Sequence, residues 1–297
     1  MEDRLLHFYP VQGLAATASF RGADVIVCHG AQAAVVPLAL SLVRHVPPIV
    51  VIDVGTLNGG RPNRAVSWGA TRRAFRAASK IVWHSRGSKE FVEATAPELA
   101  GRGSFIAYGV DSEKFADYLS VEKEDYVLCA GSVFRDWDVL LKAWDGIRGV
   151  RLILLGAASK VATVNPCVEV WPVVDMETYC RMTAAARFTV LPLFESPISC
   201  GQMTLLQSLA LGTPVVASNV QSIRDYLGSG TVSVPPGDAP ALRDAVKTLW
   251  SDRDGQASLR REGLRAVQSE FSQVRMAREL EETIWRAVDT READCAR

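Results

Sequence analysis

The sequence has no net charge, because 33 lysine and arginine residues balance 33 aspartate and glutamate residues. No global electric field therefore recruits nucleic acid or an anionic membrane. The chain also lacks an apolar run of the roughly 18 residues that a membrane-spanning helix needs. Its first ten residues, MEDRLLHFYP, lack the apolar stretch of a signal peptide. We expect a cytoplasmic protein that does not bind nucleic acid.

Cysteine is scarce and scattered, since the chain has six cysteines and no C-x-x-C spacing. We therefore expect reduced thiols rather than disulfides or a zinc site, and we assign no metal ligand and no cofactor. Hydrophobic residues, in contrast, make up 48% of the 297 residues. That share is enough to fill the core of one large domain or two ordinary ones.

Short apolar runs alternate with helical patterns along the chain, which is typical of a parallel sheet covered by helices on both faces. Charge density rises between Asp111 and Glu124, and a new strand, loop and helix follow. We predict an α/β protein with two Rossmann-like, doubly wound parallel-sheet domains, 1–121 and 122–272, and a C-terminal helix in 273–297 that crosses back to the first domain or covers its own. Ligands of such sheets bind beyond the carboxyl ends of the strands. The predicted strands are 24–28, 49–53, 80–83, 104–107, 126–130, 151–155, 168–171, 188–191, 214–217 and 231–234.

The stretch from Phe194 to Leu227 joins a strand end, a helix start and a buried strand. Ser199-Cys200-Gly201 offers small residues with backbone N–H groups, and a helix is expected over 203–211. The positive end of that helix faces whatever leaves the strand tip. Gly212-Thr213-Pro214 then ends the helix. These features suit a nucleotide, although any βαβ unit of a parallel sheet would share them.

Four segments, in the same order, resemble one enzyme family. Besides the stretch above, they are FIAYGVDSEKF (105–115), YVLCAGSVFRDWDVLLKAW (126–144) and VPPGD (234–238). They are similar to segments of the GT-B glycosyltransferases, particularly the large retaining, nucleotide-sugar-dependent group 1 (family 4-like) enzymes. The resemblance covers residues 24–288. It implies transfer of a sugar from a nucleotide-sugar donor to a glycan, lipid or small-molecule acceptor.

The segment that resembles the family's phosphate loop carries the first assigned residues. Gly131 and Ser132 are assigned to donor binding. Arg135 lies where the family commonly has lysine, and a guanidinium can hold two diphosphate oxygens at once as the glycosidic bond breaks. The family usually has a second basic residue near the glycine, which is missing here. A solvated loop arginine is the structural alternative.

Two glutamates that the family spaces eight residues apart correspond here to Ser199 and Gln207. Gln207 can still hydrogen-bond ribose hydroxyls, without the charge that strengthens such bonds. Ser199 cannot replace a carboxylate that reaches the sugar. Glu195, at the strand tip, is therefore assigned that role, with an exposed strand-end acid as the alternative. The other donor-binding residues assigned to this segment are Cys200, Gly201, Gln202 and Thr204.

Two polar residues, His29 and Asp53, end adjacent predicted strands of the first domain. Both are expected at the carboxyl edge of the sheet, and both are assigned to catalysis. His29 matches the second histidine of the family's HxH-like strand end, although a structural role is an equal alternative. Asp53 stands at or one residue before the family's sugar-contacting histidine. His7, His45 and His84 belong to no recognised motif and are interpreted as incidental.

The first domain is shorter than the resemblance requires, because GT-B enzymes usually carry two or three βα units before the strand at 24–28. We expect a minimal domain, a fragment with a late start, or a partner subunit that supplies acceptor binding. A basic stripe, expected on one helix, would suit a phosphorylated lipid or a peripheral membrane contact, although such stripes are usually solvated helix faces. Its residues are Arg72, Arg73, Arg76 and Lys80.

The sequence thus favours a glycosyltransferase that acts without a metal ion and with retention. A non-catalytic nucleotide- or sugar-binding subunit is one alternative, suggested by the short first domain and by Ser199 and Gln207. A nucleotide-sugar epimerase or phosphorylase is another, because the fold alone does not fix the chemistry.

Overall fold

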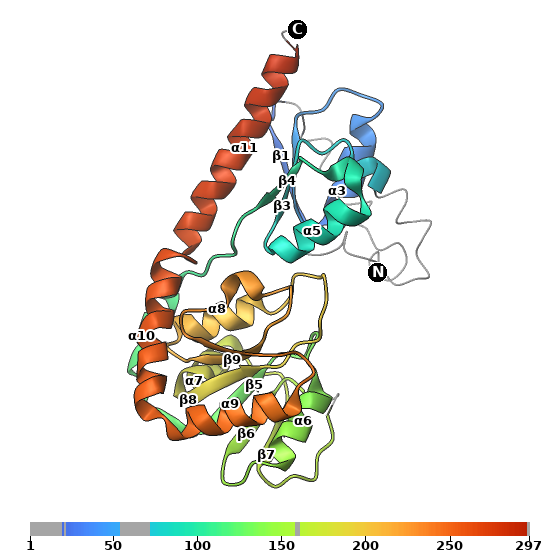
Figure 1. The fold of residues 1–297 in the computed structure, drawn as a ribbon. Helices are drawn as coiled ribbons and strands as arrows, with labels where there is room; N and C mark the ends of the chain where they lie inside the picture. The colour runs from blue at the N-terminus through green and yellow to red at the C-terminus, as the bar shows by residue number, and fades with distance from the viewer. Residues whose placement is uncertain (1–19, 21, 54–71, 158–160, 296–297) are drawn as a thin grey trace. The chain divides into compact units, whose positions relative to one another are not determined.

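The computed structural model describes residues 20, 22–53, 72–157 and 161–295 (Figure 1). The chain forms two compact units. The first unit comprises Met1–Ala107, Pro197–Ser199 and Ala277–Arg297. The second comprises Tyr108–Ser196 and Cys200–Met276.

The first unit is built on a parallel sheet in the order β1-β2-β3-β4. Its strands are short and rich in isoleucine and valine, which suits strands that are covered on both faces. Leu38, Phe75 and Trp83 are fully buried and fill the core around Val51 and Ile81. The elements are β1 (Ile26–His29), α3 (Ala31–Ser41), β2 (Ile49–Asp53), β3 (Lys80–Trp83), α5 (Arg86–Thr95), η3 (Pro97–Leu99) and β4 (Gly103–Phe105).

The second unit is built on a parallel sheet in the order β10-β9-β8-β5-β6-β7. Buried residues on its helices, such as Leu140, Trp144 and Val246, pack against Val127 and Phe188 of the central strands. The strands are β5 (Glu124–Ala130), β6 (Arg151–Leu155), β7 (Val168–Trp171), β8 (Ala186–Leu191), β9 (Val215–Ser218) and β10 (Thr231–Val234). The helices are η4 (Ser112–Ser120), α6 (Trp137–Asp145), α7 (Met176–Ala185), α8 (Gln202–Ala210), η5 (Arg224–Tyr226), α9 (Ala239–Ser251) and α10 (Arg253–Ser269).

The strand order of the second sheet reverses between β5 and β8. Strands β6 and β7 follow β5 on one side, whereas β8, β9 and β10 lie on the other side. In doubly wound sheets such a reversal opens a crevice at the carboxyl ends of the two strands. The loops that follow Ala130 of β5 and Leu191 of β8 therefore mark the expected ligand site.

The ten predicted strands are all confirmed, and none of their ends differs from the predicted end by more than two residues. The predicted domain boundary lies at 121/122, whereas the two compact units divide between Ala107 and Tyr108. The segment between these points packs within the second unit, because Phe115 and Tyr118 lie against buried Leu211. Helix α11 (Gln273–Cys295) begins in the second unit and belongs to the first from Ala277 onward.

Candidate functional site

The loop after β5 is tied to the loop after β8 by backbone hydrogen bonds. Arg135 and Leu193 form an antiparallel bridge, and the Asp136 N–H donates to the Pro192 carbonyl oxygen at 2.9 Å. Gly131 at the start of the loop has φ 80°, a conformation that favours glycine. Phe134 also has a positive φ, 54°. The loop is thus held in one shape at the point where the strand order reverses.

Arg135 is buried beneath this loop, with only 5% of its surface exposed. Its Nε and Nη2 donate to the Ala130 carbonyl oxygen at 3.2 and 2.8 Å, and its Nη1 donates to the Val133 carbonyl oxygen at 2.9 Å. Nη2 also donates to Thr204 Oγ1 on α8, at 3.2 Å. The guanidinium therefore joins the loop to α8. Direct contact between Arg135 and a diphosphate stays a prediction.

Helix α8 begins at the same edge of the sheet, and no side chain caps its N-terminus. Gly201 is the N-cap residue and has φ 98°. A Cβ atom at Gly201 would lie 2.7 Å from Leu193 Cδ1, so both backbone conformation and space require glycine. The positive end of the helix dipole at this position favours an anion.

A pocket of about 280 Å³ lies at this edge of the second sheet. It combines glycine turns after β5 and β6, apolar side chains and two polar side chains of α8, and none of its lining side chains is charged. Four of the residues assigned to donor binding from the sequence line it: Gly131, Ser132, Thr204 and Gln207. The remaining lining residues are Ala130, Leu155, Gly156, Val173, Val174, Met176, Tyr179 and Met203.

The other residues assigned to this segment lie outside the pocket lining. Gln202 is buried, and its Nε2 donates to the Ser222 carbonyl oxygen at 2.8 Å. The Cys200 thiol points to the Val133 carbonyl oxygen, with a sulfur-to-oxygen distance of 3.8 Å. Ser199 belongs to the first unit, so it does not share a compact unit with Gln207.

Glu195 is exposed just beyond β8. Its Oε1 accepts a hydrogen bond of 2.8 Å from the backbone N–H of Gln221, in the loop that follows β9. One carboxylate oxygen is thus held by the neighbouring loop. Its predicted contact with a sugar remains a prediction.

In the first unit, His29 and Asp53 are the last residues of the neighbouring strands β1 and β2, and His29 is exposed. His84, which follows β3, is buried, and its Nδ1 lies 2.8 Å from the Ile106 carbonyl oxygen. Because a carbonyl only accepts, Nδ1 carries a proton. Burial lowers the pKa of His84, the hydrogen bond to the Ile106 carbonyl opposes this shift, and repulsion from nearby His29 adds to it.

His84, interpreted from the sequence as incidental, lies within electrostatic range of the assigned residue His29 at the same sheet edge, and its role is not tested. The missed signal is its place directly after a buried strand, which it shares with the residues that were assigned. His45 lies in the exposed loop before β2, and His7 falls outside the described residues.

Two Asp-x-Asp triplets, Asp136-Trp137-Asp138 and Asp252-Arg253-Asp254, resemble the metal motif of the other major glycosyltransferase fold, and they weigh against metal independence when the sequence alone is considered. Asp136 Oδ1 accepts from the Val139 N–H and caps α6, and Asp252 Oδ1 accepts from the Gly255 N–H and caps α10. Within the part of the chain that the structure describes, no three His, Cys, Asp or Glu side chains are grouped so that they could hold a metal ion.

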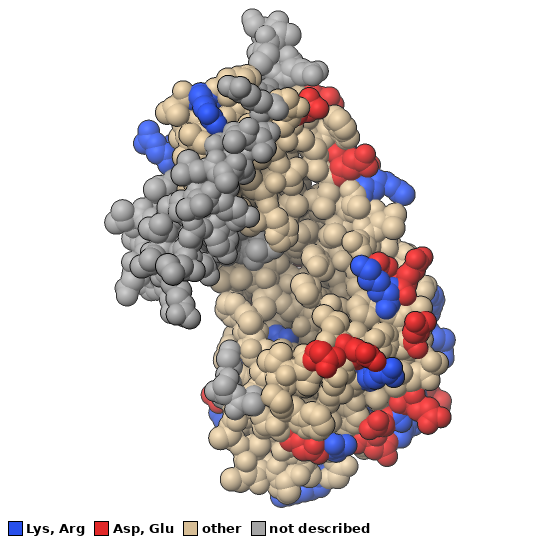
Figure 2. All heavy atoms as spheres, turned by 180° about the vertical axis from the view of Figure 1, so that it is seen from behind, with Lys and Arg blue, Asp and Glu red and all other residues tan. Residues whose placement is uncertain are grey.

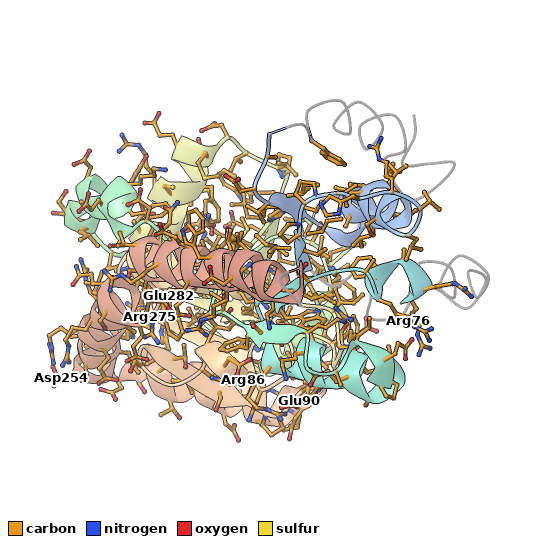
Figure 3. All side chains as sticks on the ribbon, turned by 90° about the horizontal axis from the view of Figure 1, so that it is seen from above. Arg76, Arg86, Glu90, Asp254, Arg275 and Glu282 are labelled. Carbon is orange, nitrogen blue, oxygen red and sulfur yellow. The ribbon has the colours of Figure 1, made fainter. Side chains whose placement is uncertain are left out.

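The predicted basic stripe does not lie on one helix, because Lys80 begins strand β3. Arg72 pairs with Glu98 at 3.0 Å. Arg76, which is labelled in Figure 3, lies 3.7 Å from the same carboxylate. Acidic and basic side chains of the second unit are interspersed on the face shown in Figure 2. Among the described helices, none combines the length and hydropathy needed to cross a bilayer.

Comparison with known proteins places this geometry in context. Residues 124–252 match the family model of glycosyl transferases group 1. A sucrose-phosphate synthase structure from Thermosynechococcus elongatus is similar, with 18% identity and a TM-score of 0.76 over 96% of this chain and 77% of that one. The structure of Anabaena HepE in complex with UDP is also similar, with 17% identity and a TM-score of 0.73 over 91% of this chain and 81% of that one. The catalytic domain of starch synthase IV from Arabidopsis thaliana, bound to ADP and acarbose, has 14% identity and a TM-score of 0.68 over 94% of this chain and 76% of that one. No curated protein sequence matches the chain significantly.

Proposed function

We propose that this chain, which has the GT-B fold and whose residues 124–252 form a glycosyl transferases group 1 domain, transfers a sugar from a UDP-sugar to an acceptor with retention and without a metal ion. The observation that carries the proposal is the pocket between the glycine loop after β5 and the uncapped start of α8. HepE, a structural neighbour, has been solved with UDP and with UDP-glucose, which supports the choice of base.

The pocket suggests how the donor is oriented. The base is proposed to lie against the apolar side chains of Leu155, Val173 and Met176, which offer it a dry surface. The Gln207 side chain can donate to one ribose hydroxyl and accept from another. The diphosphate is proposed to lie against the backbone at Gly131, where no side chain blocks close approach, and at the positive end of α8.

Charge develops on the diphosphate as the bond to the sugar breaks, and preorganised dipoles and charges that face it lower the barrier. The buried Arg135 guanidinium is proposed to supply positive charge from behind the loop and to hold the loop in shape. Because Arg135 is only 5% exposed, water screens its charge less than that of a surface arginine. Glu195 is proposed to contact the transferred sugar from the tip of β8.

The groups at the carboxyl edge of the first sheet are proposed to serve the acceptor. His84, whose Nδ1 faces the Ile106 carbonyl oxygen and whose pKa is lowered by burial, is proposed to act as a base toward an acceptor hydroxyl. His29 and Asp53, at the ends of the adjacent strands, complete the proposed acceptor side.

A non-catalytic nucleotide-binding subunit is the second candidate. It is favoured by the neutral donor pocket, in which Gln207 stands in place of a glutamate, and by the hydrogen bonds that already engage the Arg135 guanidinium within its own loop. Such a subunit would bind UDP and release no sugar.

Release of UDP from UDP-glucose and related UDP-sugars, with EDTA present, distinguishes the two candidates. We expect turnover, either as transfer or as slow donor hydrolysis, and we expect Glu195→Gln to reduce it while leaving UDP affinity nearly unchanged, because UDP lacks the sugar. Exposed Glu281→Gln on α11, which removes the same charge, serves as a matched control. Tight UDP binding without any donor breakdown would favour the non-catalytic subunit.

A further inference from the structure

A second cavity lies in the first unit, at the edge opposite to His29 and Asp53. Its volume is about 380 Å³. It is formed where strands β2 and β3 begin, where the chain enters β4, and by one residue of α11. The lining residues are Ser41, Val46, Pro47, Pro48, Ile49, Ala77, Ser79, Lys80, Arg102 and Ala287.

Two cations line this cavity, one from the start of β3 and one from the residue before β4. Ile81 pairs with Gly103 in the sheet, so Lys80 and Arg102 occupy the preceding positions of the two segments. The segments are joined beside them, because the Ile81 N–H donates to the Arg102 carbonyl oxygen at 2.9 Å. Like charges at facing positions of a sheet are destabilising unless something neutralises them.

No carboxylate in the described part of the chain neutralises this pair. The lining contains no acidic residue, and the structure records no ion pair for Lys80 or Arg102 among the described residues. Glu98, which lies in η3 just before β4, is paired with Arg72. The Arg102 Nη1 donates a hydrogen bond of 2.6 Å to the Ala78 carbonyl oxygen, which fixes the guanidinium in position. The other N–H groups of the guanidinium can then bind an anion.

The rest of the lining indicates the kind of anion. The Ser79 hydroxyl adds a polar group beside the two cations, whereas most of the other wall is apolar. The volume lies within the range of small-molecule pockets and exceeds what a phosphate group alone would fill. A ligand that pairs one phosphate with a compact uncharged body matches both parts of the lining.

We propose that this cavity binds a small phosphate monoester, such as a sugar phosphate, with the phosphate on Lys80 and Arg102 and the uncharged body against Pro47, Pro48 and Ala287. The site is separate from the donor pocket, which lies in the other unit. It therefore does not depend on the proposed transferase activity.

Calorimetry on the full chain tests the proposal, with glucose 6-phosphate as the probe and with inorganic phosphate and glucose as separate arms. The titrations are run with and without saturating UDP, so that binding in the donor pocket is recognised. We expect glucose 6-phosphate to bind more tightly than inorganic phosphate and glucose not to bind. Lys80→Met should weaken binding at least about tenfold, as loss of a charged hydrogen bond does.

Arg76→Met is the matched control, because Arg76 is an exposed cation of the same unit that does not line the cavity. Lys80→Arg keeps the charge and should retain binding, and melting curves show whether each variant is folded. Absence of glucose 6-phosphate binding to the wild type, or equal affinity in folded Lys80→Met and wild type, would overturn the site. Equal affinity for inorganic phosphate and glucose 6-phosphate would overturn the proposed ligand class.

Discussion

The carboxyl edges of the two sheets carry different chemistry. In the second unit the edge is formed by glycine turns, a helix start and a pocket without charged side chains, and the buried Arg135 lies behind the loop. In the first unit the strands end in the ionisable residues His29 and Asp53, and His84 follows the next strand. Under the proposed function, donor binding would depend on backbone shape, whereas the acceptor side would depend on titratable side chains.

The dependence on backbone shape is tested most severely at Gly201. Gly201→Ala should cost about 2–5 kcal/mol of stability, the sum of a left-handed residue and an overpacked contact, and should weaken UDP binding. Gly237→Ala is the control, because Gly237 has φ 75° but nothing within 4 Å of a built Cβ atom. Urea unfolding should show the smaller cost of about 1–2 kcal/mol there. Equal costs at the two glycines would mean that the contact with Leu193 is unimportant.

Arg135→Ala tests the role of the positive charge that is buried beneath the loop after β5. Turnover should fall by about a hundredfold or more, as it commonly does when one electrostatic donor is removed, and UDP affinity should fall less. Arg135→Lys should restore part of the turnover, because it keeps the charge but cannot make the same set of hydrogen bonds. Exposed Arg148→Ala should leave turnover unchanged. Turnover of Arg135→Ala equal to that of the wild type would remove Arg135 from the mechanism.

A half-buried lysine, Lys123, lies directly before β5 at the amino edge of the same sheet. Its Nζ donates to the Ala186 carbonyl oxygen and to Thr213 Oγ1, at 2.9 and 2.8 Å. Burial, together with the charge of Arg260, lowers its pKa from 10.5 to about 7. The unfolded chain therefore binds more protons than the folded chain between these two values.

Lys123 should thus make the free energy of unfolding rise with pH above 7, by up to about 1.4 kcal/mol per pH unit. Urea unfolding at pH 7.0 to 8.5 measures this slope, and Lys123→Met should lose it whatever its absolute stability. Lys142→Met, at an exposed lysine on α6, should keep it. If the free energy of unfolding rose equally with pH in Lys123→Met and in the wild type, the lowered pKa of Lys123 would not be its cause.

The smallest effect is expected at the neutral ribose contact. Gln207→Glu should tighten UDP binding by about 1 kcal/mol, because a charged acceptor replaces a neutral one. Gln268→Glu, an exposed change of the same charge, should leave the affinity unchanged. Weaker UDP binding in Gln207→Glu would place Gln207 next to the diphosphate instead of the ribose.

The sequence predicts the strands well because each is a short apolar run between turn residues. It also places Gly131, Ser132, Thr204 and Gln207 near one another, since all four follow from the strand-loop-helix pattern. The burial of Arg135 could not be predicted, because it depends on a bridge to Leu193 and a hydrogen bond to Thr204, both distant in the sequence. His84 was missed for a similar reason, because its partner is a carbonyl on the segment that follows β4.

The capping roles of Asp136 and Asp252 are local, because each carboxylate accepts from the N–H three residues further along the chain. The sequence of an Asp-x-Asp triplet is the same whether the triplet binds a metal ion or begins a helix. Only the hydrogen bonds to the Val139 and Gly255 N–H groups show what the first carboxylate of each triplet does.

Titration of the protein with UDP in EDTA by calorimetry tests the central claim most directly. We expect UDP to bind without a divalent cation, because the proposed donor site offers the diphosphate backbone N–H groups, the start of α8 and the charge of Arg135. Gln207→Leu should weaken this binding, and Gln268→Leu should not. Absence of binding by UDP, or binding only after Mn²⁺ is added, would contradict the account.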